Sequence, residues 1–217
     1  MEENLLPLFP LEVVLLPEGL LPLHIYEDRY KQMIGARLEA KAANAPGQEF
    51  GVVLAREQEV QTLGCTAAII NVTRKYPDGR FDILAIGRRR FEVLFTREEK
   101  PYLEGEVVFF DDDRGADTPS DEEAQQAIDR FRGTMQRLHK TAEIPIHFPR
   151  PYRHLSFRMA GSLPLDADFK QQLLSMRNES ERLRQVLRAM DALVAGLELL
   201  QKAQEKAGGN GNRPSMS

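Results

Sequence analysis

The hydrophobic pattern of this chain changes its period once, near residues 111–117. From residue 4 to about 110, short β-branched and aliphatic runs are broken by proline and glycine, which is typical of short strands joined by tight connections. After that stretch, apolar residues recur with the period of an amphipathic helix. We therefore predict an α+β protein in which a β-rich part, residues 1–115, precedes a helical bundle, residues 116–207.

The β-rich part has the elements of a small, strongly bent sheet or barrel. Val13–Leu16 and Val52–Ala55 read as buried strands. The runs Ala67–Tyr76 and Arg80–Ile86 flank Pro77-Asp78-Gly79 and predict a hairpin, because glycine tolerates the positive φ of a tight turn. Two further strand candidates are Phe91–Phe95 and Leu103–Phe110.

One helix is expected within the β-rich part, where Glu27 or Asp28 can cap it. Its apolar face carries Tyr30, Met33, Ile34 and Leu38. This spacing places the four side chains on one side of the helix, so we expect the helix to pack on the sheet.

The helical part opens with Thr118 as a cap and Pro119 at the first helical position. A single apolar stripe follows, made by Ala124, Ile128, Phe131, Met135 and Leu138. Shorter helices are expected near Tyr152–Ala160 and Asp166–Met176. Asn178 or Ser180 can cap a long last helix, whose stripe is Leu183, Leu187, Met190, Val194, Leu197 and Leu200. The glycine-rich end, residues 208–217, is predicted to be a disordered tail.

Charge and cysteine content exclude several classes of protein. The 29 Lys and Arg against 33 Asp and Glu leave a net charge of -4, so no global positive field attracts nucleic acid. The single cysteine, Cys65, rules out an internal disulfide framework and suits a reducing compartment. The acidic, proline-broken N-terminus is no secretory signal, and no apolar run is long enough to span a membrane. We expect a soluble, cytoplasmic protein.

Three ordered blocks resemble the N-terminal domain family of Lon proteases. The first is LPLFPLEVVLLPEGLLPLHIYEDRY at residues 6–30, similar to the family's two proline-flanked strand segments and the helix start after them. The second runs from GCTAAI at 64–69 through PDGRFDILAIG at 77–87 to Arg90-Phe91. The third is SLPLDADFKQQLLSMRNESERLRQVL at 162–187.

The resemblance spans nearly the whole chain and implies a PUA-like β pseudo-barrel followed by a helical bundle. In Lon this region contacts protein substrates. Lon continues into an ATPase module with a G-x-x-x-x-G-K-[ST] phosphate loop and a protease module with a Ser–Lys dyad. Because the dipeptide Gly-Lys does not occur here, we expect a stand-alone member that lacks both modules.

The function predicted from this resemblance is a non-enzymatic module that binds unfolded or extended protein segments, as an adapter or chaperone-like factor. A separate ATP-dependent protease is a further expected partner, and no cofactor is expected. Two alternatives stay open. PUA-like barrels resemble RNA-binding folds, although the net charge disfavours RNA or nucleotide binding. An unrecognised hydrolase is the second, disfavoured by the missing motifs.

Two residues invite a catalytic interpretation. His24 and Glu27 form a candidate base and orienter, but Glu27 also suits the positive end of a helix dipole and Arg29 can pair with it. For these residues we favour a structural role in helix capping and packing over catalysis. Cys65 needs a nearby histidine to act as a nucleophile, and no protease signature surrounds it, so we favour a core residue.

Three other clusters are weighed against ordinary roles. His147 and His154 do not have a zinc-ligand spacing. Arg88–Arg90 could bind a phosphate or an acidic peptide, but a solvated strand edge is the favoured interpretation. Asp111–Asp113 lack the spaced oxygen ligands of a calcium loop and are predicted to be an exposed linker.

A peptide-binding surface needs exposed apolar and aromatic side chains in a groove or at a strand edge. The hairpin and the apolar passage at 144–149 supply candidates, with core filling as the alternative. The predicted peptide-binding residues are Tyr26, Arg29, Tyr30, Tyr76, Phe81, Ile146 and Phe148. They point to binding through the barrel and through a cleft between barrel and bundle.

Overall fold

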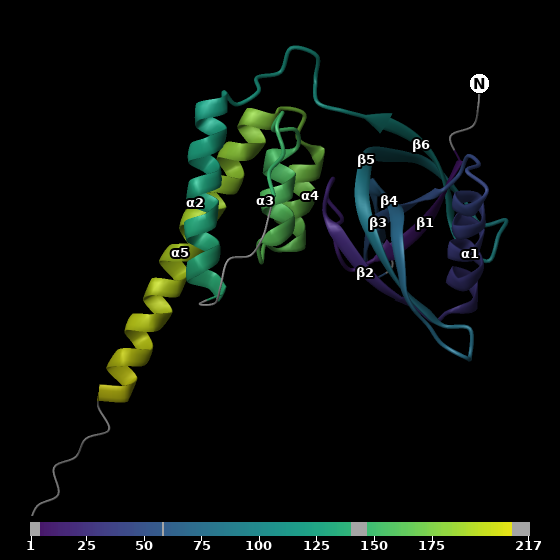
Figure 1. Ribbon diagram of the computed structural model, residues 1–217, viewed down its shortest axis with the longest axis horizontal. Helices are drawn as coiled ribbons and strands as arrows, with labels where there is room; N and C mark the ends of the chain where they lie inside the picture. Colours follow the sequence, from purple (N-terminus) through teal and green to yellow (C-terminus); the bar gives the residue numbers. More distant parts are fainter. Residues whose placement is uncertain (1–4, 58, 140–146, 210–217) are drawn as a thin grey trace, which may run out of the picture.

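A computed structural model describes residues 5–57, 59–139 and 147–209 of the chain. Within these residues there are six strands and five helices. Their order is β1 Leu5–Leu11, β2 Leu20–Ile25, α1 Asp28–Ala42, β3 Glu49–Arg56, β4 Glu59–Lys75, β5 Phe81–Arg97, β6 Glu104–Phe110, α2 Asp121–His139, α3 Leu155–Ser162, α4 Ala167–Ser175 and α5 Glu179–Gly209. The strands with α1 form one body and the later helices a second beside it (Figure 1). This arrangement confirms the predicted α+β class, with a barrel followed by a bundle.

The strands form one sheet that closes on itself. Their order is β2-β5-β4-β3-β1-β6, and β6 also pairs with β5. β1 and β3 are parallel, whereas the other pairs are antiparallel. β5 is long enough to pair with β2 along its first part, as at Leu20–Ile86, and with β6 along its second part, as at Phe91–Phe109. The closure therefore leaves β2 outside the ring of five strands.

The hairpin prediction is confirmed, but its second strand is longer than expected. Gly79 takes a φ of +84° in the turn between β4 and β5, which is the left-handed conformation that glycine adopts without strain. The predicted strand Phe91–Phe95 is not separate, because β5 runs without a break through Gly87. Gly87 serves close packing instead of a turn. A Cβ built on it would lie 2.1 Å from the carbonyl oxygen of Leu16.

The predicted strand Val13–Leu16 is wrong. β1 ends at Leu11, and the following residues form a loop that turns at Pro17 and at Glu18, whose φ is 66°. The loop is held on β5, because the Glu18 amide donates to the Gly87 carbonyl at 2.9 Å. Leu15 and Leu16 are buried all the same, whereas Val13 is exposed. The two leucines reach the core from the loop, so burial alone did not imply a strand.

The helix inside the β-rich part is confirmed, with one change at its start. Glu27 occupies the N-cap position in extended conformation, but its side chain makes no capping hydrogen bond. It accepts a hydrogen bond from Arg29 Nε at 2.8 Å, as the pairing alternative expected. The predicted face is buried at Tyr30, Met33 and Ile34. α1 lies on the side of the barrel away from the bundle (Figure 1).

The caps of the bundle helices differ in part from those predicted. Thr118 does not cap α2; Ser120 does, because its Oγ accepts from the Glu123 amide at 3.2 Å while the Glu123 carboxylate accepts from the Ser120 amide at 2.8 Å. Asn178 caps α5 as predicted, and its Oδ1 accepts from the Glu181 amide at 2.9 Å. These two reciprocal hydrogen bonds form a capping box. It explains why α2 begins at Asp121, two residues after Pro119, which was predicted to be the first helical residue.

The structure buries most of the apolar stripes predicted for α2 and α5. The α2 stripe is buried at Ala124, Ile128, Phe131 and Met135. The α5 stripe is buried at Leu183 and Met190, half-buried at Leu187, and exposed at Leu200, where the helix extends beyond the bundle (Figure 1). α5 continues through Gly208 and Gly209, which the tail prediction included. The rest of that predicted tail, 210–217, lies outside the described residues.

Among the described residues, no helix combines the length and the apolarity that a membrane crossing requires.

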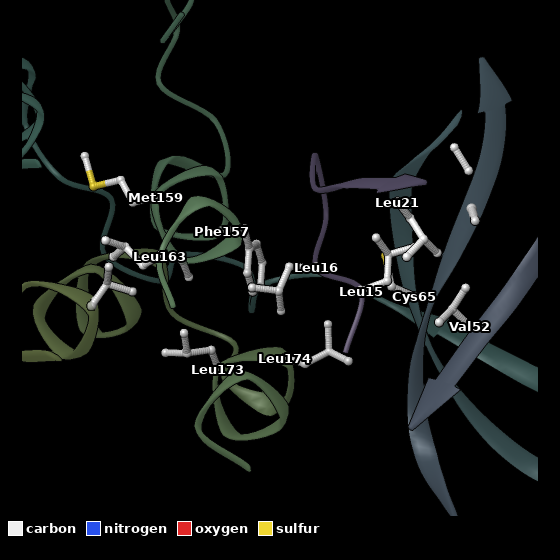
Figure 2. Packing of buried hydrophobic residues seen from close by; sticks show 14 of the residues in the cluster. Leu15, Leu16, Leu21, Val52, Cys65, Phe157, Met159, Leu163, Leu173 and Leu174 are labelled. Atoms are coloured by element: carbon white, nitrogen blue, oxygen red, sulfur yellow. The ribbon is translucent and has the colours of Figure 1, made fainter. Parts of the chain in front are cut away.

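One large apolar core runs from the barrel into the bundle. Figure 2 shows Leu15 and Leu16 of the loop after β1 between Cys65 of β4 and two bundle residues, Phe157 and Leu174. A second, smaller core lies on the opposite face of the sheet, inside the barrel, and consists of Leu6, Leu8, Val53, Phe91 and Val107. Because the large core is shared, barrel and bundle are packed together at this junction.

A buried ionic network also joins the two parts. Arg182 of α5 is fully buried and donates two parallel hydrogen bonds to Asp112, at 2.9 and 2.8 Å. Arg90 of β5, which is 3% exposed, donates to the same carboxylate at 2.7 Å. Glu179 pairs with Arg182 at 2.5 Å and accepts from the Ser156 amide at 2.8 Å. Hydrogen-bonded ion pairs thus link the barrel, the segment between β6 and α2, and the bundle.

Two predictions about these charges are therefore wrong for one residue each, while Arg88, Arg89, Asp111 and Asp113 are exposed as predicted. Arg88–Arg90 was predicted to be a solvated strand edge; the first two arginines are exposed, but Arg90 is buried and donates to the Leu174 carbonyl at 3.1 Å. Asp111–Asp113 was predicted to be an exposed linker, whereas the Asp112 carboxylate is bound by two arginines. Arg90 and Asp112 pair with each other and with residues 174–182, far away in the chain, so local charge patterns did not reveal these partners.

The Asp112 carboxyl makes stability sensitive to acid. Burial by itself raises its pKa, but hydrogen bonds and charges from Arg182 and Arg90 outweigh burial and hold the pKa below its ordinary value of 3.8. The unfolded chain therefore binds this proton more tightly than the folded chain does. We expect the contribution of Asp112 to be complete above about pH 4 and to be lost as pH falls through the lower, folded pKa.

Urea denaturation at a series of pH values checks this expectation against Asp112→Asn, which cannot titrate at this position. The free energy of unfolding of the wild type should fall more steeply below about pH 4 than that of the variant. Other carboxylates titrate in both proteins, so the comparison isolates Asp112. Equal acid slopes in the two proteins would contradict the assignment.

Candidate functional site

The barrel wall forks between β4 and β5. The antiparallel ladder between these strands ends at the pair Leu63–Glu92. Beyond that pair, β4 follows β3 as far as Glu59, whereas β5 follows β6 as far as Arg97. Within the described part of the chain, no backbone pairing joins the two diverging segments. Each therefore presents a strand edge that is open to a further strand.

Bundle residues approach this fork on one side. The side-chain amide of Gln171 in α4 donates to the Leu63 carbonyl at 3.0 Å, and Arg56 pairs with Asp168 of α4 at 2.6 Å. The carbonyl of Leu63, the last paired residue of β4, is thus already bonded. The segments that diverge from it, 59–62 and 93–97, are the open edges.

A groove of about 390 Å³ lies between the diverging strands. Its lining consists of Leu8, Val60, Gln61, Thr62, Val93, Leu94, Phe95 and Thr96. Leu8 is fully buried and belongs to the small core, so the groove reaches the barrel interior. Val60, Leu94 and Phe95 are exposed apolar residues at its mouth. An apolar depression beside free backbone edges has the composition of a binding site.

A β-bulge turns two consecutive apolar side chains of β5 outward. The register of β5 against β6 shifts between Val93 and Phe95. In a regular strand neighbouring side chains point to opposite faces, but here Leu94 is 49% exposed and Phe95 is 69% exposed. Leaving both in water gives up burial worth roughly 1.5–3 kcal/mol for each side chain. Such exposure marks a surface that binds something apolar.

Close packing holds the last paired residues of the fork in place. The ring of Phe91 lies inside the barrel against Gly64 of β4, where an added Cβ would be 2.4 Å from the ring and 2.5 Å from the Val52 carbonyl oxygen. Only glycine allows this approach. β4 and β5 are thus fixed at Leu63–Glu92, and the groove begins directly after the fixed point.

The residues from 5 to 192, which include this groove, match the protein family described as the ATP-dependent protease La (LON) substrate-binding domain. The chain belongs to this family. The match confirms the resemblance predicted from the three sequence blocks, and it concerns the substrate-binding domain of Lon, not its protease domain.

Relatives and solved structures agree with the Lon assignment. The Lon protease of Flavobacterium johnsoniae is 26% identical over 93% of this chain, and Lon protease 2 of Herpetosiphon aurantiacus is 24% identical over 89%. The chain spans about a quarter of the length of these relatives. A Lon N-terminal domain protein from Xanthomonas campestris superimposes with a TM-score of 0.63 at 25% identity, covering 85% of this chain and 98% of that one. The N-terminal domain of Mycobacterium avium complex Lon protease shares the fold, with a TM-score of 0.62 at 18% identity, covering 87% and 98%.

The structure gathers some of the predicted peptide-binding residues around His24. The ring centroids of His24 and Tyr26 are 6.0 Å apart, and those of His24 and Tyr76 are 5.6 Å apart. Tyr26 is 59% exposed. The guanidinium groups of Arg74 and Arg80 lie 4.8 and 5.2 Å from the Tyr76 ring centroid. We call His24, Tyr26 and Tyr76 the aromatic cluster, a second exposed surface separate from the groove.

The other predicted residues do not join this cluster. Tyr30 is buried and stacks on Phe9 with ring centroids 4.0 Å apart, while the Arg29 guanidinium lies 4.6 Å from the Tyr30 ring. Phe81 is half-buried against the large core. Phe148 lies in the bundle, 5.5 Å from the Phe131 ring centroid, and Ile146 lies outside the described residues.

The catalytic alternatives gain no support from the geometry. His24 Nδ1 lies 2.5 Å from Asp82, not Glu27, and the Tyr76 hydroxyl donates to the other Asp82 oxygen at 2.9 Å. These two hydrogen bonds lower the pKa of Asp82. Cys65 is fully buried, and burial raises the pKa of its thiol far above the ordinary range, so it stays protonated. Within the described residues, no group of three or more His, Cys, Asp or Glu is placed to hold a metal ion.

The sequence interpretation missed the groove residues Val60, Leu94 and Phe95. One local signal was available: in Phe91–Phe95, apolar residues at 93, 94 and 95 break the alternation of a half-buried strand. Such a break is compatible with a bulge. The end of the β4–β5 ladder, however, depends on pairing between segments about 30 residues apart in the chain.

Proposed function

We propose that this protein binds extended, apolar segments of other polypeptides in the groove between β4 and β5. The observation that carries the proposal is the end of the ladder at Leu63–Glu92, beside a groove with Leu94 and Phe95 exposed. The family description as a substrate-binding domain supports it. So does the similarity to proteins named Lon protease.

Strand addition explains how such a site would recognise many sequences. A peptide that pairs with the edge of β5 forms backbone hydrogen bonds whatever its sequence, and every second side chain turns toward the groove. Unfolded segments offer both a free backbone and uncovered apolar side chains. Folded proteins hide both, so the site would distinguish the two states.

The proposal includes a role for the bound segment. The chain acts as an adapter that performs no covalent chemistry and delivers extended segments to an ATP-dependent protease. Two features support a binding role over catalysis: the Cys65 thiol is enclosed in the core, and the His24 imidazole is held by Asp82.

Replacing Phe95 with serine should weaken peptide binding about tenfold or more, because Phe95 is the largest exposed apolar side chain of the groove. The probe is a fluorescein-labelled peptide in which leucine, phenylalanine and valine alternate with serine, measured by fluorescence anisotropy. Stability should change by less than about 0.5 kcal/mol, because the side chain is already in water. The decrease therefore reports binding and not unfolding.

Three controls sharpen this test. Leu200→Ser removes a similarly exposed side chain, 63% in water, from the end of α5 and should leave affinity unchanged. Tyr26→Ser tests the aromatic cluster as a rival surface. A peptide methylated on alternate backbone nitrogens cannot donate those hydrogen bonds and should bind poorly. Normal binding by Phe95→Ser together with a loss in Tyr26→Ser would move the site to the aromatic cluster and overturn the proposal.

A further inference from the structure

Exposed glutamates stand at the ends of both strands that border the groove. β4 runs back from its last ladder pair to Glu59, and β5 runs forward to Arg97, so the start of β4 and the end of β5 lie toward the same end of the groove. Glu57 precedes β4, Glu59 is the first residue of β4, and Glu98 and Glu99 follow β5; all four are exposed. We call them the acidic rim: Glu57, Glu59, Glu98 and Glu99.

Nearby cations are engaged with other partners. Arg56 pairs with Asp168 at 2.6 Å, and Lys100 pairs with Glu104 at 2.9 Å. Arg97 lies 3.8 Å from a glutamate of β6. The rim carboxylates make no ion pair with any residue in the described ranges. The acidic rim therefore presents uncompensated negative charge next to an apolar groove.

We infer that the groove selects extended apolar segments that carry lysine or arginine directly beside their apolar residues. This inference rests on the proposed function. A basic side chain that leaves the groove at its open end meets the acidic rim, while its aliphatic stem continues the apolar contact. An acidic flank meets charges of its own sign and is rejected. Both effects are electrostatic between exposed groups, so salt weakens them.

Three labelled peptides test the inference, each with the same alternating apolar core and with lysine, serine or glutamate on its flanks. At low ionic strength the lysine-flanked peptide should bind roughly tenfold more tightly than the serine-flanked one, and the glutamate-flanked peptide should bind most weakly. At about 1 M salt, where the screening length is about 3 Å, the three affinities should converge.

A charge-neutral variant assigns the preference to the acidic rim. Changing Glu57, Glu59, Glu98 and Glu99 to glutamine should abolish the preference for lysine and leave the affinity for the serine-flanked peptide unchanged. The matched control changes the same number of exposed carboxylates elsewhere and should keep the preference. It consists of Glu39→Gln, Glu122→Gln, Glu181→Gln and Glu198→Gln. Both variants remove the same formal charge from a chain of net charge -4.

Each outcome separates this inference from the proposed function. If the serine-flanked peptide binds and the lysine-flanked peptide binds no tighter, the charge preference is wrong and the proposed function stands. If the control variant loses the preference equally, overall charge is responsible and the acidic rim is not. If the serine-flanked peptide fails to bind at any salt concentration, the proposed function itself fails.

Discussion

Replacing Arg182 with methionine should lower the free energy of unfolding by about 3–5 kcal/mol, because the change removes one partner of a buried ionic network. Arg182 is fully buried and bonds to Asp112, Glu179 and the Ser156 hydroxyl. Methionine fills much of the space but leaves Glu179, which is 5% exposed, without its cation. Urea denaturation followed by circular dichroism measures the loss.

Two further variants show whether the unpaired Glu179 carboxylate causes this loss of stability. Adding Glu179→Gln to Arg182→Met removes the uncompensated carboxylate, so the double variant should be more stable than the single one. Arg130→Met breaks an exposed pair with Asp191, at 2.8 Å, and should cost less than about 1 kcal/mol. An Arg182 variant no less stable than the Arg130 variant would show that the network does not hold barrel and bundle together.

Replacing Gly87 with alanine should cost about 3 kcal/mol of stability, because the new Cβ would lie 2.1 Å from the carbonyl oxygen of Leu16. The obstacle is backbone, so no rotamer change relieves it. The loop must move away from β5, which strains two hydrogen bonds of 2.9 Å, from Glu18 to Gly87 and from Gly87 to Gly19. The same movement withdraws the loop leucines from the core that barrel and bundle share.

Gly133→Ala is the matched control for the glycine experiment. Gly133 lies within α2, and a Cβ built there meets no atom within 4 Å. Alanine should therefore stabilise the protein by about 0.5–1 kcal/mol, because it restricts the unfolded chain and favours the helix. Thermal unfolding of both variants compares the two effects. A Gly87 variant with the wild-type melting temperature would mean that the loop does not require this close approach.

Local pattern was sufficient to predict most of the elements. The face made by Tyr30, Met33 and Ile34 is buried, and the hairpin turns at Gly79, as expected from helical spacing and turn chemistry. These features depend on residues within one or two turns of each other. Helical spacing and turn chemistry depend on residues close together in the chain, so the sequence is enough to predict them.

The sequence pattern gave wrong predictions where the burial of a residue depends on partners distant in the chain. The run Val13–Leu16 has the composition of a strand, yet it is a loop whose leucines are buried between Cys65 and Phe157. Arg90 reads as part of a solvated basic run, and its carboxylate partner Asp112 reads as linker. In each case the decisive contact joins segments that the sequence keeps apart.

The candidate site divides in the same way. The sequence named Tyr26 and Tyr76 among the peptide-binding candidates, and the structure places their ring centroids 6.0 and 5.6 Å from that of His24. It did not predict the groove. Leu94 and Phe95 become exposed together because β5 bulges against β6, and the free edge exists because the ladder ends at Leu63–Glu92.

By itself the sequence determined the family of this protein, most of its helices and strands, and most of the apolar faces that are buried, because these follow from residue types at short, regular spacings. The tertiary structure decided which charges are buried as partners and where the barrel wall opens. Those outcomes depend on register and closure between strands and helices far apart in the chain, where a shift of one residue exchanges a buried side chain for an exposed one.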